Sequence, residues 1–130
     1  MSLLEEHIKP TFGGHEKFVF RYGWLKKGVD ALSGNPEIFT DDKALVVLGV
    51  GKNMVRSIRY WCLATGLFRE TRGKGPVRRL QLTDLANRLV TNDGWDPYLE
   101  DTGTLWLLHW QLVSNLTRAL IWNLTFCAYY

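Results

Sequence analysis

The stretch that decides the fold is TDDKALVVLGVGKNMVRSIRYWCLAT, residues 40–65. Thr40 or Asp41 can cap the start of a helix, and the apolar run that follows stops at the Gly-Val-Gly turn of residues 49–51. A second helix is predicted over residues 52–65, ending at Gly66, because its apolar residues recur at helical spacing along one side. Two helices joined by a glycine-containing turn are typical of a helix-turn-helix.

The segments around this pair extend the pattern. A helix is predicted over residues 24–32, before the pair. After it, residues 67–72 and 77–82 alternate like two strands around a Gly-Lys-Gly-Pro tip, which predicts a hairpin. A further short helix is predicted over residues 85–90. This order of elements predicts a mainly α fold with a small β-hairpin, arranged as a winged helix-turn-helix.

The chain is expected to divide at about residue 92. Residues 1–92 are predicted to hold the winged helix-turn-helix with an N-terminal lead-in, in which residues 17–22 alternate like a short strand. Residues 93–130 are predicted to form a C-terminal helical extension, dominated by a long Trp-rich helix over residues 104–126. Polar residues interrupt this helix and make membrane insertion costly, so we expect no membrane partner.

The predicted long helix is apolar around most of its circumference, and such a helix needs burial on nearly all sides. A small winged helix can hardly cover it, so we expect a homodimer, a partner protein or a further helical region to do so. The residues predicted to form this interface are Trp106, Trp110, Leu116, Leu120 and Trp122.

The charge of the chain is concentrated in one block. The whole sequence has 16 Lys and Arg against 13 Asp and Glu, a net charge of +3. Residues 52–79 hold eight basic residues and one acidic residue, a net charge of +7, which leaves −4 for the rest. A basic block confined to one predicted helix and its hairpin favours a nucleic-acid partner, and we expect double-stranded DNA.

In a helix-turn-helix, the helix predicted over residues 52–65 is the one that enters the DNA major groove. Arg and Asn side chains can make bidentate contacts to guanine and adenine, and a basic hairpin tip can reach the phosphate backbone. The candidates on the helix, all expected to face outward, are Lys52, Asn53, Arg56, Arg59 and Tyr60. The candidates on the hairpin are Arg72, Lys74, Arg78 and Arg79. The alternative is a protein–protein adaptor that uses the winged helix and the Trp-rich helix.

We expect a protein that is not an enzyme and has no cofactor or metal. The Gly-Val-Gly-Lys run is not a Walker A loop, because Val46 and Asn53 stand where that loop needs its first glycine and its hydroxyl residue. The histidines and cysteines lack the spacing of metal ligands. A hydrolase using His15 with the acidic residues of 93–101 is a third hypothesis, although those acidic residues fit a turn and helix caps better. Two isolated cysteines and the lack of a signal peptide favour the cytoplasm.

Several motifs make the chain resemble a known bacterial family. They are TFGGHEKF (residues 11–18), GWLKKG (23–28), LGVGKNMVRSIRYWC (48–62), DPYLED (96–101) and LWLLHW (105–110). Over nearly the whole chain they resemble the domain of unknown function 4007, whose members are often encoded beside DNA phosphorothioation genes and are generally longer. The resemblance implies a role in a DNA-modification or phage-defence system, with sulfur-modification or defence proteins as partners, and it assigns no catalytic residues.

Overall fold

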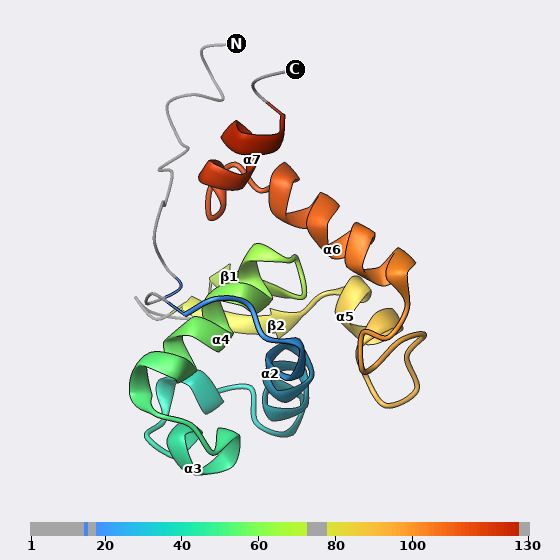
Figure 1. The fold of residues 1–130 in the computed structure, drawn as a ribbon. Helices are drawn as coiled ribbons and strands as arrows, with labels where there is room; N and C mark the ends of the chain where they lie inside the picture. The colour runs from blue at the N-terminus through green and yellow to red at the C-terminus, as the bar shows by residue number, and fades with distance from the viewer. Residues whose placement is uncertain (1–14, 16–17, 73–77, 128–130) are drawn as a thin grey trace.

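The computed structural model describes residues 15, 18–72 and 78–127. Its centre is a pair of packed helices, α2 (Tyr22–Gly34) and α4 (Lys52–Ala64) (Figure 1). Between them in sequence lie the 3-10 helix η1 (Ile38–Thr40) and the short helix α3 (Ala44–Leu48). The elements that follow α4 are β1 (Phe68–Arg72), β2 (Arg78–Leu82), α5 (Asp84–Leu89), α6 (Thr102–Ser114) and α7 (Leu120–Phe126). The described chain is therefore mainly helical with one small hairpin, and this part of the prediction is confirmed.

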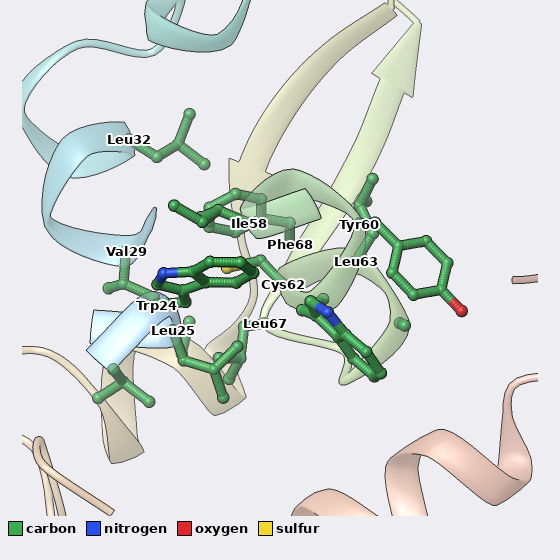
Figure 2. Packing of buried hydrophobic residues seen from close by; sticks show 14 of the residues in the cluster. Trp24, Leu25, Val29, Leu32, Ile58, Tyr60, Cys62, Leu63, Leu67 and Phe68 are labelled. Atoms are coloured by element: carbon green, nitrogen blue, oxygen red, sulfur yellow. The ribbon is translucent and has the colours of Figure 1, made fainter. Parts of the chain in front are cut away.

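A glycine allows α2 and α4 to pack closely. A Cβ atom at Gly28 would lie 2.7 Å from the Sγ of Cys62 and 3.1 Å from Ile58, closer than side chains normally approach. Leu25 and Val29, on either side of Gly28, are fully buried against the same cluster (Figure 2). Burial among these apolar side chains raises the pKa of the Cys62 thiol well above its ordinary value. The thiol therefore stays protonated and acts as a packing group.

The end of α4 is fixed by a glycine in the left-handed conformation. Gly66 has a φ of +77°, which residues with a Cβ atom rarely adopt. The backbone N–H of Gly66 donates to the carbonyl oxygen of Leu63 (3.2 Å), and that of Leu67 donates to the carbonyl oxygen of Cys62 (2.9 Å). These two bonds form a Schellman motif, which satisfies the last carbonyls of the helix and directs the chain into β1. The predicted stop at Gly66 is confirmed.

The hairpin is tied to its neighbours by Thr83. Its strands pair antiparallel, from Phe68 opposite Leu82 to Arg72 opposite Arg78. Directly after β2, the Thr83 hydroxyl donates to the carbonyl oxygen of Gly66 (2.6 Å) and accepts from the backbone N–H of Ala86 (3.3 Å). The second bond caps α5. One side chain thus holds the start of α5 against the turn that ends α4.

The strand predicted in the lead-in is not present among the described residues 18–22. Residues 18–21 are irregular, and Tyr22 already belongs to α2. Phe18 and Phe20 instead pack half-buried against the core, and the carbonyl oxygen of Phe18 accepts a hydrogen bond from the Nε1 of Trp61 (3.3 Å). Contacts with α4 therefore replace strand pairing in this segment.

The first helix of the predicted pair begins later than expected. It starts at Ala44 instead of Thr40 or Asp41. The Asp41 carboxylate accepts a hydrogen bond from the backbone N–H of Lys43 (3.0 Å) and so forms a turn that precedes the helix. The resulting α3 has five residues, and its Val46 and Val47 are exposed.

The prediction of one long helix over residues 104–126 is wrong. Helix α6 ends at Ser114, and α7 begins at Leu120. Asn115 ends α6 because its side-chain oxygen accepts hydrogen bonds from the backbone N–H of Arg118 and from the Thr117 hydroxyl, both at 3.0 Å. Its Nδ2 donates to the carbonyl oxygen of Ala64 (3.2 Å), which holds this turn against the end of α4.

The two C-terminal helices pack on one another at one end of the molecule, and α3 lies at the opposite end, with α4 between them (Figure 1). Helix α6 buries Leu108 and Leu112 on one side and leaves Trp106 and Trp110 exposed on another. Within the part of the chain that the structure describes, no helix is long and apolar enough to cross a bilayer.

Candidate nucleic-acid interface

The first half of α4 carries exposed polar side chains. Lys52, Asn53 and Arg56 are all exposed, as predicted. Gly51 precedes the helix and has no side chain to cap it, so the first-turn N–H groups are suited to an anion such as phosphate. This end of the helix therefore combines a basic side chain, an amide and a guanidinium, the groups that contact phosphates and base edges in DNA complexes.

Arg59, in the second half of α4, is tied to other elements. Its Nη2 lies 2.8 Å from Oε1 of Glu70 on β1, and the Nη2 of Arg118 lies 3.1 Å from the same oxygen. The Glu70 side chain is only 14% exposed, whereas those of Arg59 and Arg118 are 36% and 29% exposed. The one acidic residue of the basic block therefore joins α4, β1 and the turn between α6 and α7. Arg59 is only partly accessible to a ligand.

The prediction that Tyr60 faces outward is wrong. Its side chain is 6% exposed, and its hydroxyl donates to the carbonyl oxygen of Arg118 (2.9 Å). Figure 2 shows Tyr60 at the edge of the buried cluster, with the hydroxyl pointing away from the core. Burial raises the pKa of the Tyr60 phenol, and the nearby Arg118 guanidinium opposes part of this change. Tyr60 serves to attach the C-terminal extension to α4.

The hairpin adds exposed arginines to the surface. Arg72 and Arg79 are exposed, and Nη2 of Arg79 lies 3.7 Å from the carboxylate of Glu37, with both side chains 65% exposed. A pair this long and exposed contributes little to stability. The backbone of Arg78 pairs with Arg72, but its side chain lies outside the described residues, as does the whole of Lys74.

Two further arginines belong to this surface, although the sequence did not single them out. Arg69 lies on β1 and is exposed, with its Nη2 donating to Oε1 of Gln81 (3.2 Å). Arg69 belongs to the basic block of residues 52–79, so the clustering of basic residues in the sequence is enough to make it a candidate. Arg118 lies outside that block, and only the turn at Asn115 brings it beside Glu70.

The residues predicted to form a protein interface fall into two groups. Trp106 is 69% exposed, Trp110 is 64% exposed and Leu116 is 42% exposed. Leu120 and Trp122 are half-buried, and the Trp122 ring lies edge-to-face with that of Trp61, with the centroids 6.4 Å apart. The exposed members could contact a partner, whereas Trp122 mainly attaches α7 to α4.

Two of the four acidic residues between 93 and 101, Asp96 and Asp101, cap local structure. The Asp96 carboxylate accepts hydrogen bonds from the backbone N–H groups of Glu100 and Asp101, both at 2.9 Å. A side-chain hydrogen bond from Thr104, together with these backbone bonds, lowers the pKa of Asp96. Oδ1 of Asp101 accepts from the backbone N–H of Gly103 (2.6 Å) and caps α6. These bonds match the turn-and-cap interpretation of the sequence.

The described residues bring no three His, Cys, Asp or Glu side chains together in a group that could hold a metal ion. His15 packs beside Tyr60 and Trp61, and the His109 ring packs edge-to-face with Phe126. His7 lies outside the described residues. The two described histidines are therefore surrounded by aromatic rings.

A family model described as "Protein of unknown function (DUF4007)" matches residues 12–130. The chain belongs to the DUF4007 family. No curated protein matches this DUF4007 chain.

Two solved structures resemble this DUF4007 chain. Magnesium-ion-bound SspB is 42% identical over 95% of the chain, with a TM-score of 0.86, and a second SspB crystal structure is 46% identical over 85%, with a TM-score of 0.77. The matched regions make up 38% and 33% of those two SspB chains. The chain thus spans little more than a third of the solved proteins that it resembles.

Proposed function

We propose that this DUF4007 chain is a winged-helix DNA-binding protein of a bacterial phosphorothioation or phage-defence system, acting as a regulator or as the DNA-contacting subunit. The observation that carries the proposal is the exposed set Lys52, Asn53 and Arg56 on the first half of α4, followed in the chain by the exposed arginines of the hairpin. The order of α2, α3, α4 and the hairpin supports the proposal, because a winged helix-turn-helix has its elements in this order; the proposal assigns α4 as the helix that enters the groove.

Sequence similarity supports the assignment to a phosphorothioation or phage-defence system. The motifs resemble a family encoded beside phosphorothioation genes, and the chain is 42% and 46% identical to two SspB structures. Within this proposal the chain works in the cytoplasm, where its DNA is, alongside sulfur-modification or defence proteins. Within the same proposal it contacts DNA without catalysing a reaction itself and without a cofactor or metal.

The proposed contacts divide between the two elements. Asn53 and Arg56 reach base edges in the major groove, and Lys52 contacts a phosphate near the start of α4. Arg72 and Arg79 hold phosphates from the hairpin, as do Lys74 and Arg78. Arg59 contributes mainly charge, since Glu70 holds its guanidinium.

The test is fluorescence anisotropy of labelled duplex DNA, titrated at several salt concentrations. Arg56→Ala is expected to weaken binding by about tenfold or more, because one good base contact contributes about 1–3 kcal/mol. Replacing both Arg72 and Arg79 by alanine is expected to lower the slope of log K against log salt by about 0.9 per lost phosphate contact. Arg88→Ala is the matched control, since Arg88 is exposed on α5 and belongs to neither of the two elements proposed to contact DNA. Unchanged affinity in the Arg56 variant would refute the proposal.

A protein–protein adaptor is the second candidate, and the exposure of Trp106 and Trp110 favours it. Under this alternative, duplex DNA does not bind at physiological salt, and the chain associates with itself or with a partner protein through α6. Sedimentation of the wild type and of a Trp106→Ala, Trp110→Ala variant tests self-association through α6, which the double variant should lose. Trp95→Ala is the control, because Trp95 is 74% exposed but lies in the loop before α6.

A further inference from the structure

A pocket of about 370 Å³ lies where residues 15 and 18–20, α4 and α7 meet. Its lining is mostly aromatic, with rings from His15, Phe18, Phe20, Tyr60, Trp61 and Trp122. Val19, which is 74% exposed, and Ile121, which is 47% exposed, also border it. The DNA contacts proposed above use none of these residues.

The rings of the pocket hold one another in place. The Trp61 ring lies edge-to-face with Phe20 at 5.6 Å and with Trp122 at 6.4 Å between centroids, and it is nearly parallel to His15 at 6.2 Å. The indole Nε1 of Trp61 also donates to the carbonyl oxygen of Phe18 (3.3 Å). Phe18, Phe20 and Trp122 are half-buried and are held by the nearly buried Trp61, so they offer π faces and edges to a flat ring with little further loss of side-chain freedom.

A cation lies at the border of the pocket. The guanidinium of Arg21 lies 6.0 Å from the centroid of the Phe18 ring and 5.0 Å from that of Trp24. Arg118 is bound through its carbonyl oxygen to the Tyr60 hydroxyl, while its guanidinium pairs with Glu70. A flat ring attached to a phosphate would therefore find aromatic side chains inside the pocket and the Arg21 guanidinium at its border. This combination of stacking surfaces and cations is the one by which proteins hold unpaired bases.

We propose that this aromatic pocket binds an unstacked nucleobase of the DNA that the chain contacts. The inference rests on the proposed DNA-binding function and names a second feature of its substrate, an unpaired base. A base that is already unpaired costs least to place in such a pocket, because no base pair has to be broken first. A purine should bind better than a pyrimidine, since its larger ring system has more surface to stack.

The experiment compares two labelled duplexes that differ only in one unpaired adenine, again by anisotropy. The wild type is expected to bind the duplex with the unpaired base about tenfold more tightly, in line with the effect of one base–aromatic stack. Trp122→Leu should remove this preference without changing the affinity for the fully paired duplex, and Trp122→Phe should keep most of it. Trp106→Leu is the control, because Trp106 is exposed on α6 and does not line the pocket.

A second variant covers the chance that Trp122→Leu unfolds α7. Ile121→Glu places a carboxylate beside the pocket on an exposed position, where it repels the phosphate next to a captured base. It should also remove the preference, whereas Leu124→Glu, on the same helix but not lining the pocket, should not.

The outcomes separate the two proposals. Equal binding of both duplexes by the wild type overturns the pocket and leaves the DNA-binding function standing. Retention of the preference in folded Trp122→Leu and Ile121→Glu variants also overturns the pocket. Binding of only the duplex with the unpaired base, lost in these variants, supports the pocket and refutes contact with paired DNA through α4. Binding of neither duplex refutes both.

Discussion

The two halves of α4 have different surroundings, although its 13 residues form one regular helix. In the first half, Lys52, Asn53 and Arg56 are exposed. In the second half, Tyr60 and Trp61 are buried, and the lead-in residues, β1 and the turn after α6 all make contact with it. The helix is thus covered by other segments around its C-terminal half, whereas its N-terminal half keeps an exposed polar side. Stability and the proposed contacts with paired DNA should therefore separate along its length.

The strongest test of this separation is the truncation of a large side chain in the C-terminal half of α4, called here the anchored half. Trp61 is 3% exposed, and replacing a buried tryptophan by alanine costs about 3–5 kcal/mol. Trp61→Ala should therefore reduce the free energy of unfolding, measured in urea, by that amount. Asn53→Ala, in the exposed half, should change it by less than about 0.5 kcal/mol. Similar losses in the two variants would contradict the comparison.

The second prediction concerns the carboxylate that anchors Arg59. Glu70→Gln leaves two partly exposed guanidinium groups without their counter-charge, which should cost about 1–2 kcal/mol in the free energy of unfolding. The same change removes the one negative charge of the basic block, so affinity for duplex DNA should rise.

Glu37→Gln is the matched control for this change, because Glu37 also faces an arginine, Arg79, but at 3.7 Å and with both side chains 65% exposed. Its effect on unfolding should be close to zero. A loss of stability in Glu37→Gln as large as that in Glu70→Gln would show that charge alone, and not the lower exposure of Glu70 (14%), is responsible.

Local signals explain what the sequence could predict of this helix. The stop at Gly66, the hairpin that follows and the exposed start at Lys52 depend on residues a few positions apart. A glycine in a left-handed turn and alternation along a strand act within that range. The basic surface was predicted for the same reason, because its exposed members lie close together in the chain.

Long-range contacts explain what the sequence could not predict. Tyr60 follows Arg56 by four residues, so the two lie along one stripe of the helix. From the sequence, this stripe is predicted to be exposed to solvent. The stripe is covered at one end by Arg118, which is 58 residues further along the chain. Similarly, the break at Asn115 rests partly on a hydrogen bond to Ala64, 51 residues away. No pattern of apolar spacing within α4 or α6 contains this information.

The third prediction tests the anchor at Tyr60 itself. Tyr60→Phe removes the hydrogen bond to the carbonyl oxygen of Arg118 and should cost about 1 kcal/mol in the free energy of unfolding. Duplex DNA affinity should not change, because Tyr60 is buried. Tyr98→Phe is the control, since Tyr98 is 68% exposed, and it should leave stability unchanged. If Tyr60→Phe lowered DNA affinity while its free energy of unfolding stayed at the wild-type value, Tyr60 would belong with the DNA-contacting residues and not with the anchor.

Tyr60 also predicts a pH dependence. Because burial raises the pKa of its phenol in the folded state, the folded protein holds this proton more tightly than the unfolded chain does. The stability that results is fully present below the ordinary tyrosine pKa of about 10 and is lost as the pH rises toward and through the raised value. Unfolding measured between neutral and strongly alkaline pH should therefore show a smaller alkaline loss in Tyr60→Phe than in the wild type.

The smallest effect is expected outside α4, at Asp96, whose pKa is lowered by hydrogen bonds from Thr104 and from two backbone N–H groups. A carboxyl group of this kind contributes stability above its unfolded pKa of about 3.9, and that contribution is lost as the pH falls through the lower folded value. Asp96→Asn should therefore weaken the dependence of stability on pH in the acid range, without affecting DNA binding at neutral pH. Asp93→Asn, at an exposed position of the same loop, is the control. If Asp96→Asn changed DNA affinity, the C-terminal extension would influence the exposed half of α4 as well as the anchored half, and the separation along the helix would fail.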